Sequence, residues 1–270
     1  MKSPSTTAYL SLGSNLGNRA FHLQKALFEL GAQAGEVDRI SGVYQSPAWG
    51  FEGGEFLNAC VSLKTSLPPQ ALLETMLKIE QEAGRLRKEG PGYRSRTLDL
   101  DLLYYGEEVI QTKTLKVPHP HIQDRRFVLK PLSDIAPQFY HPVLQRDHRN
   151  LLQECRDTTP VTKVPLRLFP TPEAFFENLG FVAIEGNIGA GKTTLARRIS
   201  RELNAKLILE RFEENPFLPR FYEDQARYAF PLELSFLADR YQQFIEGTRQ
   251  LDLFRNFVVS DYDIYKSLIF

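Results

Sequence analysis

Cysteine is scarce in this sequence, and long apolar runs are absent. Only Cys60 and Cys155 occur among the 270 residues, and they lie far apart. A disulfide framework is therefore not expected, and a reducing cytoplasm is the simplest location. The apolar segment nearest the N-terminus, residues 8–12, is only as long as a strand and is followed by Gly13. We expect neither a signal peptide nor a membrane-spanning helix.

Net charge is also lacking, because 33 basic residues balance 33 acidic ones. Nothing in this balance favours nucleic acid or a membrane surface as a partner. The length suits roughly two domains of about 100–200 residues each. Prolines cluster between residues 160 and 172 and indicate a connecting segment. We predict a first domain over residues 1–155, a linker over 156–177 and a second domain over 178–270.

The most informative feature present is a pair of carboxylates, Asp99 and Asp101, separated by one leucine. Side chains alternate between the faces of a strand, so both carboxylates are predicted on one face and the neighbouring leucines in the core. Like charges this close favour a bound cation, and carboxylate oxygens suit Mg²⁺. Arg96 shares their face, and Arg85 and Arg87 lie upstream. Paired carboxylates with arginines indicate a site for a metal-bound polyphosphate.

A second phosphate signal lies in the C-terminal half of the chain. The segment from Gly186 to Thr193 fits G-x-x-x-x-G-K-[ST] at every fixed position, with Gly189 and Gly191 inside it. It follows an apolar strand and opens a helix, as this motif requires. Backbone N–H groups of such a loop converge on phosphate oxygens. Lys192 would reach the β- and γ-phosphates, and Thr193 would bind Mg²⁺.

Apolar periodicity and turn residues predict the secondary structure of both domains. In the first domain we predict strands at 8–12, 40–45, 56–64 and 97–105, and helices at 19–30, at 69–83 and from 125 onward. That order favours an α+β sandwich with a largely antiparallel sheet. In the second domain, strands at 181–185, 206–209 and 257–261 and a helix at 193–203 favour a parallel α/β domain.

Five motifs, found in order, carry a resemblance of the first domain to a known family. They are Leu12-Gly13-Ser14-Asn15-Leu16-Gly17, Phe56-Leu57-Asn58-Ala59, Gly84-Arg85-Leu86-Arg87, Arg96-Thr97-Leu98-Asp99-Leu100-Asp101 and Val117-Pro118-His119-Pro120. Through them, residues 8–155 resemble 6-hydroxymethyl-7,8-dihydropterin pyrophosphokinase of the folate pathway. The resemblance implies a ferredoxin-like α/β sandwich. It also implies that ATP, a co-substrate bound with Mg²⁺, gives its terminal diphosphate to the pterin hydroxymethyl group while AMP leaves.

The same resemblance implies roles for individual residues. Asp99 and Asp101 would hold Mg²⁺, while Arg85 and Arg96 would act on the phosphates during catalysis. Other residues would contact the substrates: Glu80, Arg87, His119 and Arg125 on the ATP side, and Ser46, Pro47, Asn58 and Phe127 in the pterin pocket. The chain has Tyr93 where some members have tryptophan, and Pro120 where some have tyrosine. No residue is an evident general base.

The second domain resembles the deoxynucleoside kinases. The shared segments are Ile184 to Thr194, Leu209-Glu210-Arg211-Phe212 and Asn215-Pro216-Phe217-Leu218. The resemblance implies a P-loop kinase with a parallel sheet, able to dimerise, in which Glu210 (with Glu213 as the alternative) activates the nucleoside 5′-hydroxyl. Family members commonly have glutamine where this chain has Glu233, and Asp-Arg-Ser where it has Asp261-Tyr262-Asp263. Their arginine-rich lid would lie beyond Phe270, so we expect a partial kinase domain.

Three functions stay open at this point. The leading hypothesis joins a pyrophosphokinase to a deoxynucleoside kinase unit, with pterin, ATP and a deoxynucleoside as small-molecule partners. In the second hypothesis, the phosphate loop senses a nucleotide and regulates the first domain. In the third, the deoxynucleoside kinase is the only working activity. Taken singly, paired aspartates or loop arginines are often surface features, and His119 or Phe127 alone would suit a turn or a core. The ordered combination of motifs favours function.

Overall fold

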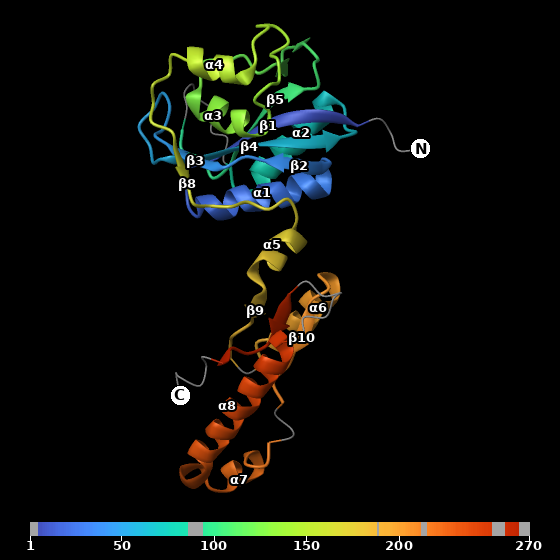
Figure 1. Ribbon diagram of the computed structural model, residues 1–270, viewed down its shortest axis with the longest axis vertical. Helices are drawn as coiled ribbons and strands as arrows, with labels where there is room; N and C mark the ends of the chain where they lie inside the picture. Colours follow the sequence, from blue (N-terminus) through green and yellow to red (C-terminus); the bar gives the residue numbers. More distant parts are fainter. Residues whose placement is uncertain (1–4, 86–93, 188, 212–214, 250–256, 265–270) are drawn as a thin grey trace. The chain divides into compact units, whose positions relative to one another are not determined.

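The computed structural model describes residues 5–85, 94–187, 189–211, 215–249 and 257–264. It divides the chain into two compact units, Met1–Thr171 (unit 1) and Pro172–Phe270 (unit 2), which Figure 1 shows in different colours. Each unit is built around its own clusters of buried apolar side chains. Each unit is therefore described by itself.

The segment between the units differs from the linker expected over residues 156–177. It contains strand β8 (Thr162–Val164), which pairs with strand β3 of unit 1. Further on, Phe169 is buried, and its backbone N–H donates to the Gln24 side chain at 3.0 Å. Prolines flank β8 instead of lying in it, so the strand keeps its N–H donors for pairing. The linker prediction is corrected here, because much of the proline-rich segment continues along unit 1.

Unit 1 contains an antiparallel sheet in the order β5-β1-β4-β3-β8, and β2 also pairs with β4. Its strands are β1 (Thr6–Ser14), β2 (Glu36–Ile40), β3 (Val43–Ser46), β4 (Phe56–Thr65), β5 (Asp99–Tyr105) and β8; the short strands β6 (Ile110–Gln111) and β7 (Lys116–Val117) pair separately. The predicted antiparallel sheet is confirmed. The single strand predicted at 40–45 is wrong, because the Ser41 hydroxyl accepts the Cys60 N–H at 2.9 Å and interrupts the ladder between β2 and β3.

Four of the described helices cover the two faces of this sheet (Figure 1). They are α1 (Arg19–Gln33), α2 (Pro69–Glu82), α3 (Arg126–Ile135) and α4 (His148–Glu154). Apolar residues of α1 and α2 share one core with leucines of β1, β4 and β5. Those of α3 and α4 form a second core on the opposite face, around Tyr104. Helix α1 begins where it does because the Asn18 side chain caps it, accepting the Phe21 N–H at 3.1 Å.

Alternation along the central strands decides which side chains can form a site. The leucines of β5 at alternate positions lie in the core under α1 and α2. Asp99 and Asp101, which alternate with these leucines along the strand, line a cavity on the other face. In β1, Gly13 lies opposite Asn58 of β4 on one side and opposite Asp99 of β5 on the other. The predicted placement of both carboxylates on one face is confirmed.

Unit 2 has, among its described residues, a three-stranded parallel sheet in the order β10-β11-β9. Its elements are α5 (Pro172–Leu179), β9 (Phe181–Ala183), α6 (Lys192–Glu202), β10 (Lys206–Ile208), α7 (Leu218–Glu223), α8 (Gln225–Arg249) and β11 (Val258–Ser260). Ala196 of α6 is fully buried in one cluster with Phe257 and Val259. The predicted parallel arrangement is confirmed, as expected where strands are joined through helices.

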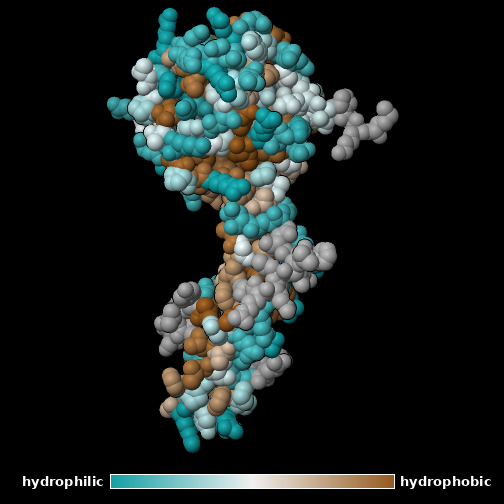
Figure 2. Space-filling model, in the orientation of Figure 1, coloured by the Kyte–Doolittle hydropathy of each residue, from teal (hydrophilic) through white to brown (hydrophobic). Residues whose placement is uncertain are grey.

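Both units expose some large apolar side chains, and in unit 2 three of them lie on one helix. On the face drawn in Figure 2, hydrophilic residues cover much of unit 1. Helix α8 of unit 2 instead exposes large apolar side chains, with Phe230, Leu234 and Tyr241 each more than half exposed. None of the described helices combines the length and the apolar character that crossing a membrane needs.

Candidate active sites

A cavity in unit 1 lies where β1 is flanked by β4 and β5. It is lined by Ser11, Gly13, Ser46, Pro47, Trp49, Phe51, Phe56, Asn58, Arg96, Asp99, Asp101, Arg125 and Phe127. The strand order places β5 on one side of β1 and β4 with β3 on the other. The cavity therefore has a charged side, formed by β5, and a side with amide, hydroxyl and aromatic groups, formed by β3, β4 and the loop between them.

On the β5 side, three arginines face two carboxylates. Arg85 Nη1 lies 2.7 Å from Asp99 Oδ1, and Arg96 Nη1 lies 2.8 Å from Asp99 Oδ2. Arg125 Nη1 lies 3.5 Å from Asp101 Oδ2. Burial and the charge of Asp99 raise the pKa of Asp101 above its ordinary value, and Arg125 opposes this only in part. The structure thus brings these five predicted residues together.

The two aspartates fit a magnesium ion bound jointly with a substrate. Both are half-buried and border the same cavity. In the part of the chain that the structure describes, no group of three or more His, Cys, Asp or Glu side chains is placed to hold a metal. Mg²⁺ is commonly held by one or two carboxylates together with substrate phosphates. Burial is the main cause of the raised pKa of Asp101 and the charge of Asp99 adds to it, so a cation brought by a polyphosphate would stabilise the ionised carboxylate.

Glu80 lies behind the charged side of the cavity. Its side chain is almost fully buried in helix α2 and does not line the cavity. One carboxylate oxygen accepts the Leu100 N–H at 2.8 Å and contacts Arg85 Nη1. These contacts hold β5 and Arg85 in place. The ATP contact that the resemblance assigns to Glu80 stays a prediction.

On the opposite side, the four residues predicted for the pterin pocket line the same cavity. Asn58 and Ser46 are buried, and the Asn58 amide donates to the Ser46 hydroxyl at 3.0 Å. The guanidinium carbon of Arg125 lies 5.2 Å from the centre of the Trp49 ring and 5.9 Å from that of Phe127. Arg125 therefore joins the aromatic side chains to the carboxylate side.

His119 is another residue predicted on the ATP side. His119 is half-buried and is not among the residues that line the cavity. Burial and the charge of Arg125 lower the pKa of His119 to about 4, so its imidazole is neutral at pH 7. Its Nδ1 accepts the His121 N–H at 3.3 Å, which leaves Nε2 as the proton-bearing nitrogen. Arg87 lies outside the described residues, as does Tyr93.

Sequence reasoning missed the aromatic wall of the cavity. Trp49, Phe51 and Phe56 all line it. The Phe51 and Phe56 rings meet edge to face with centres 6.2 Å apart, and the Arg96 guanidinium lies 5.9 Å from the Phe56 ring centre. One signal was available, because Trp49 is the single tryptophan of the chain and lies in a glycine-rich loop. Whether the Trp49 side chain points toward the cavity depends on the conformation of that loop, which the sequence pattern does not predict.

The second candidate site begins at the phosphate loop of unit 2. Gly189 and Gly191 have φ angles of 80° and 83°, which glycine adopts without strain, and α6 starts directly after them at Lys192. The Lys192 ammonium donates to the Gly186 carbonyl at 2.8 Å and to that of Asn187 at 3.1 Å. The predicted loop therefore stands at the N-terminus of a helix, where N–H groups favour anions.

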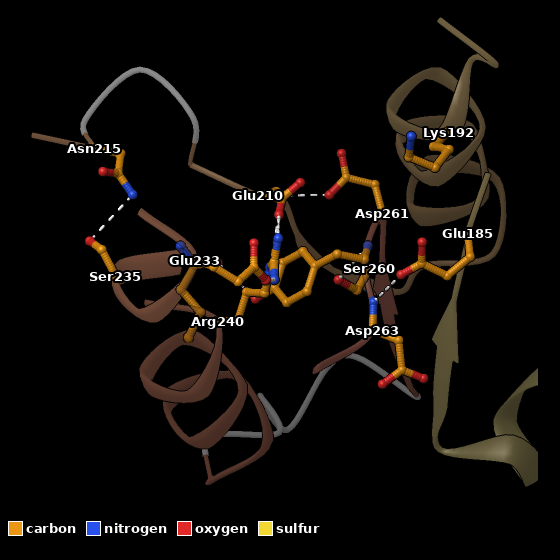
Figure 3. A network of polar contacts seen from close by, with 12 residues as sticks. Glu185, Lys192, Glu210, Asn215, Glu233, Ser235, Arg240, Ser260, Asp261 and Asp263 are labelled. Carbon is orange, nitrogen blue, oxygen red and sulfur yellow. Dashed lines mark hydrogen bonds and ion pairs between the residues drawn. The ribbon is translucent and has the colours of Figure 1, made fainter. Parts of the chain in front are cut away.

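A row of polar contacts leads from this loop to helix α8, and Figure 3 shows its central part. Thr193 Oγ1 donates to Asp261 Oδ2 at 2.5 Å, and the Glu210 N–H donates to Asp261 Oδ1 at 2.9 Å. The Arg240 Nε donates to Glu210 Oε1 at 2.8 Å, and Arg240 Nη1 lies 3.2 Å from Glu233 Oε1. Glu210 and Arg240 are both buried.

The structure adds two residues to the second site that sequence reasoning gave no role. Asp261 joins the Thr193 hydroxyl to the backbone of Glu210, and Arg240 pairs with the Glu210 carboxylate. Arg240 lies seven residues after Glu233, a helical spacing that puts both on one face of α8. Glu213, the alternative to Glu210, lies outside the described residues. Both units thus define an enzyme with sites suited to phosphate-bearing substrates.

Comparison with known proteins finds one family match in each unit. The family model described as 7,8-dihydro-6-hydroxymethylpterin-pyrophosphokinase (HPPK) matches residues 9–137, and that described as deoxynucleoside kinase matches residues 182–270. A 2-amino-4-hydroxy-6-hydroxymethyldihydropteridine pyrophosphokinase of Aquifex aeolicus is 47% identical over 141 residues, which are 52% of this chain and 86% of that protein. The protein of the same name from Synechocystis sp. is 41% identical over 186 residues, 66% of this chain and 92% of that protein.

Among solved structures, HPPK-DHPS of Plasmodium falciparum with pteroate is 14% identical and has a TM-score of 0.49, over 100% of this chain and 67% of that one. This is a weak likeness of fold. The sequence identity decides the matter for unit 1. The chain belongs to the 7,8-dihydro-6-hydroxymethylpterin-pyrophosphokinase family, and it carries a deoxynucleoside kinase domain at residues 182–270.

Proposed function

We propose that unit 1 transfers the terminal diphosphate of ATP to 6-hydroxymethyl-7,8-dihydropterin, a step of folate synthesis, and releases AMP. One observation carries this proposal: a single cavity joins an amide and aromatic side to a carboxylate and arginine side. The first side suits a flat polar ring, and the second suits a metal-bound triphosphate. The names of the relatives denote this activity.

The pterin is proposed to bind between the residues of β3, β4 and the start of α3. The Asn58 side-chain oxygen can accept a hydrogen bond from the polar edge of the ring, while its Nδ2 is directed at the Ser46 hydroxyl and the Tyr44 carbonyl. The Asn58 amide is held in place by Ser46, at 3.0 Å. Phe127 offers an aromatic face for stacking, and backbone groups at Ser46 and Pro47 complete the pocket.

The triphosphate is proposed to lie against β5, where positioning and charge provide the catalysis. Arg85 and Arg96 are paired with Asp99 and can exchange that carboxylate for phosphate oxygens. Asp99 and Asp101 would hold Mg²⁺, which when bound neutralises charge on the transferred group. His119, neutral at pH 7, can offer a hydrogen bond but not a charge. We assign no general base.

The test is AMP release from ATP and Mg²⁺, with and without the pterin. Asp99→Ala is expected to lower pterin-dependent AMP release on the order of 10²-fold or more, because it removes a ligand and an arginine partner. The matched control is Asp38→Ala. Asp38 lies on strand β2, pairs with Lys64 at 2.5 Å and does not line the cavity. Unchanged AMP release in Asp99→Ala would refute the proposal.

For unit 2 we propose phosphoryl transfer from ATP to the 5′-hydroxyl of a deoxynucleoside. The supporting observation is the contact row from Thr193 through Asp261 to Glu210, which links a phosphate loop to a buried carboxylate. Glu210 is proposed to accept the hydroxyl proton, and Arg240 holds the carboxylate in place. Lys192 would act on the phosphates, and Thr193 would hold Mg²⁺.

ADP formation on addition of each of the four deoxynucleosides tests this second proposal. Glu210→Gln keeps the shape of the side chain but cannot take up a proton, so ADP formation is expected to fall about 10²-fold or more. Glu202→Gln is the control, since Glu202 forms an exposed ion pair with Arg198 on α6. ADP formation that is equal in both variants would exclude Glu210 as the base.

The proposal also covers the fold of each unit, self-association and the location of the protein. The order β5-β1-β4-β3, with α1 and α2 on one face, supports a ferredoxin-like sandwich for unit 1. The loop before α6 supports a P-loop fold for unit 2 and, with unit 1, a bifunctional chain. The exposed apolar side chains of α8 support self-association of unit 2. The free thiols of Cys60 and Cys155 support a reducing cytoplasm as the location.

A further inference from the structure

We propose that Asn15 is a positioning residue that ties the aromatic loop to Arg96. The aromatic loop is residues 47–55, between β3 and β4, and it carries Trp49 and Phe51. Through this tie, one side chain holds the backbone of a segment on each side of the cavity, in addition to the contact of Arg125 with the Trp49 ring. The inference rests on the pyrophosphokinase function proposed for unit 1.

The Asn15 side chain is almost fully buried, and its amide is used in three directions. Its Nδ2 donates to the Gly54 carbonyl at 3.1 Å and to the Ser95 hydroxyl at 2.9 Å. Its Oδ1 accepts the Arg96 N–H at 2.7 Å. These partners lie 39, 80 and 81 positions away in the sequence. One short side chain therefore fastens two distant segments to the end of β1.

Each fastened segment delivers side chains to the cavity. Gly54 belongs to the aromatic loop, whose Trp49 and Phe51 line the cavity wall. Arg96 pairs with Asp99 at 2.8 Å, so a shift of the Arg96 backbone would move a guanidinium group on the phosphate side. The Asn15 N–H also donates to the Arg96 carbonyl at 3.1 Å, which fixes this backbone from two directions.

Asn15 itself is not among the residues that line the cavity, so it acts through its partners. The loop approaches it closely, since a Cβ added at Gly54 would lie 3.5 Å from the Asn15 carbonyl oxygen. Aspartate in place of Asn15 could still accept the Arg96 N–H, but it could not donate to the Gly54 carbonyl. Alanine would remove all three side-chain contacts. The two substitutions therefore separate the loop contact from the Arg96 contact.

The kinetic test compares Asn15→Asp and Asn15→Ala with wild type in the AMP-release assay. A buried acceptor left unpaired weakens a site by roughly 1–3 kcal/mol, which corresponds to about 5- to 150-fold. Asn15→Asp should raise the KM for the pterin within that range and change kcat less. Asn15→Ala should also lower kcat, because Arg96 is no longer held.

The matched controls are Gln24→Glu and Gln24→Ala. Gln24 also fastens a distant segment through its amide, donating to the Phe169 carbonyl at 2.8 Å and accepting the Phe169 N–H at 3.0 Å, but it does not line the cavity. These variants are expected to lower thermal stability and leave both KM values unchanged. If the Asn15 variants behave in the same way, Asn15 is structural only and the proposal is overturned.

A second readout uses Trp49, which is the single tryptophan of the chain and therefore reports on the aromatic loop alone. α,β-Methylene-ATP with Mg²⁺ should change the Trp49 fluorescence of wild type, because the phosphate side sets the loop through Asn15. In Asn15→Asp this response should shrink to the part that Arg125, which lies over the Trp49 ring, transmits directly, while the response to the pterin remains. An equal response to the ATP analogue in both proteins, or none in wild type, would overturn the tie.

The two readouts separate this inference from the function on which it rests. Absence of pterin-dependent AMP in wild type would refute the proposed pyrophosphokinase activity. A Trp49 response to the ATP analogue that depends on Asn15 would, even then, establish the tie between the loop and Arg96. Suppose that AMP release is normal and that the Trp49 response to the ATP analogue is the same with and without the Asn15 substitution. This result would support the proposed function and refute the tie.

Discussion

Asp99 and Asp101 lie two residues apart on one strand, yet their surroundings differ. Asp99 is held between two arginines, at 2.7 and 2.8 Å. Asp101 lies 3.5 Å from Arg125, and burial together with Asp99 raises the pKa of its carboxyl group. The sequence predicted that the two would share a face. It could not predict this asymmetry, because the arginines that cause it come from three separate segments of the chain.

His148 offers a test of stability at the scale of one residue. It is fully buried, its Nδ1 lies 2.6 Å from the Ala136 carbonyl oxygen, and its Nε2 lies 3.1 Å from the Tyr104 hydroxyl. A carbonyl only accepts, so Nδ1 carries the proton and Nε2 accepts from Tyr104. Burial lowers the pKa of His148 to about 4, below the ordinary value of 6.5. The neutral imidazole is therefore the form that the fold requires.

We predict that unit 1 loses stability as the pH falls from 6.5 toward 4. In that window the unfolded chain binds a proton that folded His148 does not, so acid favours unfolding. The loss from this group is about 2 kcal/mol between pH 7.5 and 5. Urea unfolding followed by Trp49 fluorescence measures it, since that signal comes from unit 1. The free energy of unfolding should depend less on pH in His148→Gln than in wild type. The control is His121→Asn, which alters an exposed histidine and should keep the pH dependence of wild type. An equally steep dependence in His148→Gln would contradict the prediction.

At the scale of elements, strand β1 builds the site because it pairs with both β4 and β5. This register sets Gly13 opposite Asn58 and Asp99, so the ring side and the phosphate side meet across a residue without a side chain. A Cβ added at Gly13 would lie 3.5 Å from Asn58 Oδ1, at the cavity lining. The strands themselves were predicted from alternation. Their order was not, because alternation in one strand carries no information about its partner.

The turn from α1 to β2 supplies an element-scale prediction. Gly35 has a φ of 147°, and a Cβ added there would lie 2.2 Å from the Lys64 carbonyl oxygen of β4. Gly84, after α2, also has a positive φ, 83°, but a Cβ there would meet nothing within 4 Å. Gly84→Ala should therefore cost about 1–2 kcal/mol for backbone strain. Gly35→Ala should cost a further 1–3 kcal/mol, roughly, for the clash.

Urea unfolding monitored by Trp49 measures both variants in unit 1. Both positions have a positive φ, so the excess loss in Gly35→Ala measures the clash together with any difference in strain between φ angles of 147° and 83°. Equal losses in the two variants would mean that β4 moves away from Gly35 without cost, contrary to the prediction.

At the scale of the whole molecule, the chain consists of two units with separate cores. Each has its own candidate phosphate site, and the Lys192 ammonium donates to the Gly186 and Asn187 carbonyls of its own loop. This arrangement favours two independent activities. The nucleotide-sensing alternative makes a different prediction. If the phosphate loop of unit 2 is a sensor, altering that loop must change the activity of unit 1.

We predict that Lys192→Ala lowers nucleoside-dependent ADP formation on the order of 10²-fold, because a donor to the phosphates is lost. Pterin-dependent AMP release should keep its kcat and both KM values. Arg198→Ala, which removes an exposed basic residue of α6 paired with Glu202, is the control and should change neither activity. A changed KM for the pterin in Lys192→Ala alone would support the sensor instead.

The sequence by itself determined what is local: the two phosphate motifs, the strand that carries Asp99 and Asp101, and the classes of both units. These depend on spacing along one segment, which a periodic pattern reports directly. The tertiary structure alone decided what is long-range: the contacts of Asn15 and Arg240, and the continuation of unit 1 to Thr171. The physical reason is that such contacts join residues far apart in sequence, and their geometry is set by strand register and packing.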